Sequence, residues 1–176
     1  EAQGLAPYDA LMDQYEPGVR SADVERIFGE VKAWLPGMIR TAVEKQQGNP
    51  PLEPKGPFPV ESQRALGLAV MKLLGFDFER GRLDTSTHPF CGGVPEDVRL
   101  TTRYDEADFT KSLMAVIHET GHALYEDGRP AQWREQPVGH CRGMTLHESQ
   151  SLLLEMQAAR SAEFVRFIAP TLRRVL

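Results

Sequence analysis

The segment His118-Glu119-Thr120-Gly121-His122 carries the clearest chemical pattern in the sequence. On a helix, two residues four positions apart lie on the same face, one turn apart, so His118 and His122 can hold one ion between them. Imidazole nitrogens bind Zn²⁺ at about 2.0–2.1 Å. Glu119 projects near the same ion and can take a proton from its bound water. The pattern therefore predicts a metal site for hydrolysis, with Glu119 as general base.

A catalytic zinc site usually has a third protein ligand and keeps one position for water. Glu126 follows His122 by four residues, so it could lie near the same helix face. A third ligand usually comes from a separate element, however. His147-Glu148 opens the next expected helix, and a helical hairpin would bring these residues back beside the first helix. The candidates for the third ligand are Glu126, Asp127, His140, His147 and Glu148.

Two interpretations compete at Glu148. The run Thr145-Leu146-His147-Glu148 matches a capping box, with Thr145 as N-cap and Glu148 at the third helical position. The residues alone support the cap and the ligand equally. His147 is better explained as a group beside the ligands or in the pocket, and His140 as a loop histidine.

The elements that must position these residues are mostly helical. Helices are expected over 21–47, with Ser21 as cap, and over 60–74, 106–126 and 145–168. Pro36 predicts a kink or break near residue 35, Gly75 ends the second helix, and Pro170 is expected to stop the last one. Residues 97–104 alternate as in a strand, whereas 76–96 show no clear period. Five prolines in the twelve residues 48–59 predict an internal loop.

Composition excludes several classes of protein. The chain has 176 residues, of which 41% are hydrophobic and 26% charged, as in an ordinary globular domain. A net charge of −5 argues against nucleic acid as the main partner. No apolar run approaches the roughly 20 residues of a membrane span, so no membrane association is expected. Two cysteines, Cys91 and Cys141, exclude a disulfide scaffold and favour a cytoplasmic location.

Four short motifs occur in one order along the chain. They are His88-Pro89-Phe90, Asp97-Val98-Arg99-Leu100-Thr101, His118-Glu119-Thr120-Gly121-His122 and His147-Glu148-Ser149-Gln150. Together they resemble the carboxypeptidase Taq family of metallocarboxypeptidases, whose motifs are HPF, DxRxT, HExxH and HE[SG]Q. Each motif alone is weak evidence, but four in this order are highly specific.

The resemblance implies a role for each matching residue. His118, His122 and Glu148 would bind the metal, one zinc ion with cobalt or manganese as alternatives, and Glu119 would be the base. His88 would line the pocket. Arg99 could orient a substrate carboxylate, or it could be an exposed strand arginine paired with Asp97. The implied fold is mainly α, a helical zincin-like metallopeptidase core with a small antiparallel β-sheet beside the HExxH helix.

The resemblance covers only the middle third of the family pattern. Two later family motifs, IRxxAD and GxxQDxHW, are absent, and the family's SRLWEN stands here as Ser151-Leu152-Leu153-Leu154-Glu155-Met156. We therefore expect residues 1–176 to form a single domain that is a fragment or short form of a larger metallocarboxypeptidase.

The favoured function is hydrolysis of C-terminal peptide bonds, with Glu119 acting on a metal-bound water and a peptide as substrate. The resemblance also suggests a homodimer. The alternative is a truncated, catalytically incomplete metal-binding or protein-interaction module of the same family. A third hypothesis is a helical domain whose histidines bind nothing.

Overall fold

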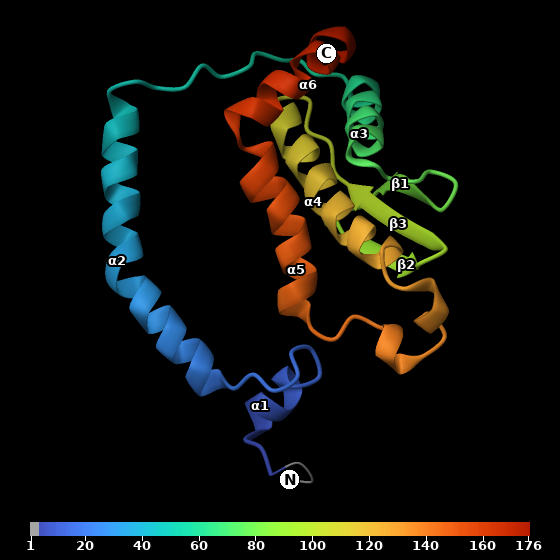
Figure 1. Ribbon diagram of the computed structural model, residues 1–176. Coiled ribbons are helices and arrows are strands. Elements are labelled where there is room, and N and C mark those ends of the chain that lie inside the picture. Colours follow the sequence, from blue (N-terminus) through green and yellow to red (C-terminus); the bar gives the residue numbers. More distant parts are fainter. Residues whose placement is uncertain (1–3) are drawn as a thin grey trace. The chain divides into compact units, whose positions relative to one another are not determined.

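The chain divides into two units in the computed structural model, which describes residues 4–176. The units are Glu1–Pro54 and Lys55–Leu176. The first contains the helices α1 (Pro7–Met12) and α2 (Ser21–Gln47) (Figure 1). Helix α2 runs through Pro36 without a break, but its ribbon bends partway along its length, which agrees with the kink that was predicted as the alternative (Figure 1). Ser21 is the first residue of α2 rather than its cap, because the extended N-cap residue is Arg20. The backbone N–H of Ser21 donates to the Asp9 carboxylate at 2.8 Å.

The proline-rich segment is a loop, as predicted, since residues 48–59 contain no helix or strand. It is followed by α3 (Val60–Leu74), which confirms the helix expected over 60–74. That helix ends at Gly75, whose φ of 96° lies in the left-handed region. Glycine adopts this conformation without a steric cost and therefore commonly ends helices.

A three-stranded sheet follows α3. Its strands are β1 (Gly81–Thr85), β2 (Cys91–Val94) and β3 (Asp97–Thr102), with β3 in the centre. The predicted strand is thus confirmed up to Thr102, and β1 and β2 are additions from a segment that showed no period. The sheet is mixed rather than antiparallel throughout. After β1, which forms one edge of the sheet, the chain crosses to the other edge and forms β2. It then turns back into the central strand β3, which runs antiparallel to β2 and parallel to β1.

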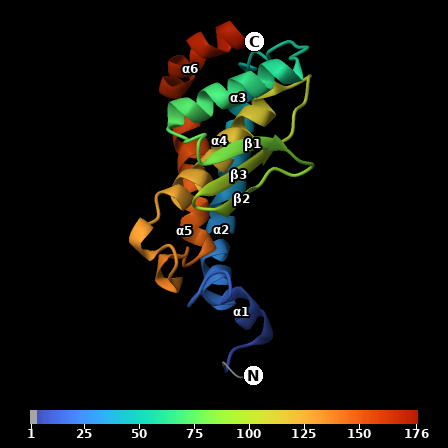
Figure 2. The ribbon, with the colours of Figure 1, turned by 90° about the vertical axis from the view of Figure 1, so that its right-hand side faces the viewer.

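Helix α4 (Phe109–Asp127) carries the HExxH motif and packs on both sides. Its N-cap is Asp108, whose side chain accepts the N–H of Thr110, and the helix begins at Phe109, whereas the sequence predicted a start near 106. Val116 and Ala123 join the core under the sheet with Val98 and Leu100. A second core lies between α4, α3 and the C-terminal helices. Its buried members are Leu66, Val70, Leu113, Ile117, Ala159 and Ile168. Figures 1 and 2 show α4 between the sheet and α5.

The C-terminal segment is not the single helix predicted over 145–168. Helix α5 (Met144–Leu152) continues as a π-helical segment, Leu153–Ala159, and α6 (Ala162–Val175) follows after a turn. The turn arises because Ser161 starts a new helix, accepting the N–H of Phe164 at 3.1 Å. Pro170 lies inside α6 and does not end it. In the described part of the chain, no helix is long and apolar enough to cross a membrane.

Candidate metal centre

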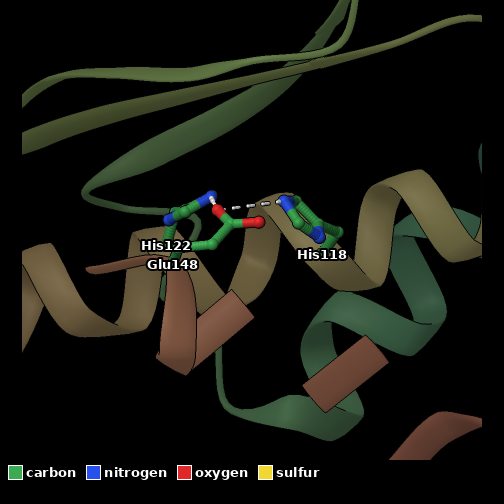
Figure 3. A group of neighbouring side chains, drawn as sticks. All are labelled: His118, His122 and Glu148. Atoms are coloured by element: carbon green, nitrogen blue, oxygen red, sulfur yellow. Dashed lines mark ion pairs between the residues drawn. The ribbon is translucent and has the colours of Figure 1, made fainter. Parts of the chain in front are cut away.

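His118 and His122 project from α4 toward the first turns of α5, where Glu148 meets them (Figure 3). Glu148 Oε2 lies 3.2 Å from His122 Nε2 and 3.7 Å from His118 Nε2. One ligand atom from each of the three residues lies within 4.8 Å of the others. The helical hairpin expected from the sequence therefore brings these three residues together.

The separations of these atoms suit a metal ion. Ligands about 2.0–2.1 Å from a tetrahedral zinc ion are about 3.4 Å from one another. The two distances to Glu148 Oε2, 3.2 and 3.7 Å, lie on either side of that value. The Glu148 side chain is 45% exposed and that of His122 only 12%, so the group opens to solvent on the carboxylate side. Two imidazoles, one carboxylate and an accessible side are the features of a catalytic site.

The capping-box interpretation of Glu148 is wrong. Helix α5 begins at Met144, and its N-cap is Gly143 in an extended conformation. Thr145 therefore lies inside the first turn and is not the N-cap. The carboxylate of Glu148 is instead directed at the two imidazoles of α4.

Gly121 allows α5 to approach α4 this closely. A Cβ atom built on Gly121 would lie 2.5 Å from Cα of Ser151 and 2.7 Å from the carbonyl oxygen of Gln150. Both are backbone atoms, so no side-chain rotation could make room. Gly121 thus permits a close approach of α5 that a side chain would block.

Gly121→Ala should therefore push α5, and Glu148 with it, away from the histidines. Overpacking typically costs about 1–3 kcal/mol, and alanine regains roughly 1 kcal/mol over glycine in a helix, so we expect a net loss of up to about 2 kcal/mol in the free energy of unfolding. Chemical denaturation of the metal-free protein measures the change in stability. Zinc titration measures the effect of moving Glu148 on zinc affinity.

Gly67→Ala in α3 is the matched control, because its Cβ would meet only side chains, at 3.4 Å or more. It should leave zinc affinity unchanged. Equal effects of the two substitutions would contradict the proposed close contact.

Glu119 lies next to the group and is buried, with 7% of its surface exposed. Burial raises the pKa of its carboxyl above the ordinary value; nearby His118 opposes this rise and Glu148 adds to it. A raised pKa brings a carboxylate closer to the range in which it can both take and return a proton near neutral pH.

His147 and Glu126 lie behind His122 rather than among the three converging atoms. His147 Nδ1 is 2.6 Å from His122 Nδ1, and His147 Nε2 is 2.8 Å from Glu126 Oε1. Two other candidates lie elsewhere. Asp127 forms an ion pair with Arg80 at 2.6 Å, and His140 is exposed at the end of a short 3₁₀ turn, Pro137–Gly139.

Arg99 and His88 are not brought to this group. The Arg99 side chain is half exposed and pairs with Asp97 at 2.6 Å. Its neighbours Val98 and Leu100 are buried in the core shared with α4, so Arg99 projects from the opposite face of the sheet. His88 is exposed in the loop between β1 and β2.

Glu155 is a residue beside the site that sequence reasoning missed. Its Oε2 lies 3.0 Å from His118 Nδ1, and its Oε1 accepts a hydrogen bond from Arg160 at 2.6 Å. Burial raises its pKa, but the hydrogen bonds with Arg160 and His118 outweigh burial, so that the net pKa is lowered. The signal in the sequence was its place seven residues after Glu148, which in an uninterrupted α-helix would be about two turns along the same face.

Two histidines one turn apart, joined by a carboxylate from a neighbouring helix, form the ligand set of HExxH metallopeptidases. Comparison with known proteins specifies the family. The pattern of the carboxypeptidase Taq (M32) metallopeptidases matches residues 1–176. The chain belongs to this family, which confirms the resemblance seen in its motifs.

Several relatives are carboxypeptidases. Thermostable carboxypeptidase 1 of Thermus thermophilus is 39% identical over 169 residues, which are 96% of this chain and 33% of that protein. Carboxypeptidase 1 of Bacillus subtilis is 38% identical over 161 residues, or 90% of this chain and 32% of that one.

Among solved structures, Trypanosoma cruzi metallocarboxypeptidase 1 is similar with a TM-score of 0.93 and 49% identity. The match covers 99% of this chain and 36% of that one. The chain thus spans about a third of the length of these relatives. The mainly helical fold with its small sheet is confirmed as that of the family.

Proposed function

We propose that His118, His122 and Glu148 bind one divalent ion, zinc with cobalt or manganese as alternatives, at the centre of a metallocarboxypeptidase. One observation carries the proposal: Glu148 Oε2 lies within 3.7 Å of Nε2 on both histidines. Neutral imidazole nitrogens and a carboxylate suit zinc. Hydrolysis at the C-terminal end of a peptide is supported by relatives that are named carboxypeptidases.

Glu119 is the general base in this proposal. Zinc bound there would polarise the scissile carbonyl and lower the pKa of a water. Glu119 takes a proton from the attacking water and delivers it to the leaving amine. Its raised pKa supports the first step, because a more basic carboxylate accepts a proton more readily.

Metal analysis and peptide turnover test this function. After gel filtration with zinc, the wild-type protein should retain about one ion per chain and His122→Ala far less, because two ligands bind more weakly than three. His140→Ala is the control, since that histidine is exposed and outside the group. Release of the C-terminal residue from a peptide measures activity. Equal, low zinc contents of wild type and His122→Ala would refute the metal site.

The alternative, a module that binds metal without turnover, has one observation in its favour. Apolar side chains on α5 and the π-helical segment are exposed: Leu152, Leu153 and Met156. Such a surface could meet another chain. Zinc-loaded protein that retains one ion but releases no C-terminal residue from any peptide would favour this alternative. The homodimer and the cytoplasmic location remain predictions.

A further inference from the structure

Each histidine of the metal centre uses its second ring nitrogen to contact a separate group of polar side chains. Nε2 of both rings faces Glu148, whereas Nδ1 of His118 contacts Glu155 and Nδ1 of His122 contacts His147. The first group ends on Arg160 and the second on Arg129. In neither group does a residue touch the other histidine through a hydrogen bond or ion pair among the described residues.

The group behind His118 is a carboxylate held from its far side. Glu155 Oε2 lies 3.0 Å from His118 Nδ1 and accepts its proton when Nε2 carries the lone pair. Arg160 donates to the other carboxylate oxygen at 2.6 Å and so prevents the carboxylate from turning away. The Glu155 side chain is 16% exposed, which shields this contact from water.

The group behind His122 has only one consistent direction of hydrogen bonding. If Nε2 of His122 binds an ion, its proton is on Nδ1, which donates to Nδ1 of His147 at 2.6 Å. His147 then carries its own proton on Nε2 and donates it to Glu126 Oε1 at 2.8 Å. Arg129 Nη2 pairs with the other oxygen of Glu126 at 2.6 Å. Each ring N–H of the two histidines thus has an acceptor when both rings are neutral.

We propose that Glu155, and His147 together with Glu126, are positioning residues that hold His118 and His122 with Nε2 directed at the metal. This inference rests on the metal site of the proposed function. Without Glu155, His118 can turn its ring or move its proton to Nε2, and both changes remove a lone pair from the site. The groups behind metal-binding histidines typically change metal affinity about 10–100-fold when they are mutated.

The main test is zinc affinity, measured by competition with a chromophoric chelator. Glu155→Leu should weaken binding about 10–100-fold. Glu155→Gln keeps an acceptor oxygen for His118 Nδ1 and should lose less. Glu163→Gln is the matched control. Glu163 is an exposed glutamate of α6 whose ion pair is a long one, with Arg166 at 3.8 Å. It should bind zinc as the wild type does.

The second group is tested in the same way. His147→Phe should weaken zinc binding about 10–100-fold, whereas His147→Gln restores an acceptor for His122 Nδ1 and should recover part of the loss. Because the two groups share no residue, the losses of Glu155→Leu and His147→Phe should multiply in the double variant. A Co²⁺-loaded Glu155→Leu protein should also show a changed visible spectrum, since the ligand field depends on ring orientation.

If Glu155 contributed to folding alone, the measurements would give a different result. The melting temperature of the metal-free Glu155→Leu protein would fall and the zinc dissociation constant would be unchanged, which would overturn the inference. Wild-type zinc affinity in both Glu155→Leu and His147→Phe would also overturn it, while the metal site itself would stand. A wild-type protein that binds no zinc would overturn the proposed function and this inference together.

Discussion

Replacing Glu119 by glutamine is expected to leave zinc bound and to slow peptide hydrolysis by about 10²–10⁴-fold, the usual contribution of a general base. Glutamine has nearly the same shape but cannot accept the proton of the attacking water. Glu119 is not among the three atoms that converge on the ion site, so the metal content should remain at about one per chain. Initial rates of C-terminal residue release and elemental analysis of the same samples measure both effects.

The stability of the metal-free protein provides the control for this substitution. Burial raises the pKa of Glu119 in the folded chain, so its favourable contribution exists at low pH and is lost as pH rises through the folded-state pKa. At neutral pH the charged carboxylate of Glu119 is costly to bury, and replacing it with the uncharged amide of glutamine removes that cost. Glu119→Gln with chelator should therefore melt no lower than the wild type. Loss of zinc together with activity would show that Glu119 is a ligand and not the base.

Glu148→Gln should lower the stability of the zinc-loaded protein strongly and that of the metal-free protein little. Glutamine removes the anionic oxygen that lies near both histidines, so zinc should bind far more weakly. At a free zinc concentration 1,000 times Kd, bound zinc stabilises the fold by about 4 kcal/mol, and the variant should lose most of this. Without metal, a half-exposed carboxylate near neutral imidazoles contributes at most about 1 kcal/mol.

Thermal melts of wild type and Glu148→Gln, each with zinc and with chelator, make the comparison. Ser149→Ala is a matched control in the same turn of α5, because its hydroxyl donates to the carbonyl of Leu146 and accepts from Nε2 of Gln150 but contacts none of the three proposed ligands. It should shift both melts equally and slightly. If Glu148→Gln also shifted both melts equally, Glu148 would not be a ligand, and His147 or Glu126 would be the remaining candidates.

Part of the fold followed from local rules. Helix α3 ends at Gly75 as expected, since the glycine adopts a positive φ that other residues avoid. The alternation of β3 was visible because Val98 and Leu100 are buried on one face of the sheet and Arg99 between them is exposed on the other, although Thr101 is also buried. The start of α5 was not, because Gly143 and Thr145 are both acceptable caps by type, and only the packed chain selects one. Strands β1 and β2 were not predicted, because both are short and because β1 pairs with β3, which lies further along the sequence.

The sequence by itself determined the pair His118 and His122, with Glu119 beside them, because helix periodicity places residues four apart on one face whatever surrounds the helix. Only the tertiary structure decided that Glu148 meets the pair, and that Glu155 and His147 lie behind the two rings. These contacts join α4 to a later segment across 25 or more residues. Their geometry depends on how closely the two helices pack and on where the π-helical segment shifts the helix face. The local spacing of residues in the sequence specifies neither.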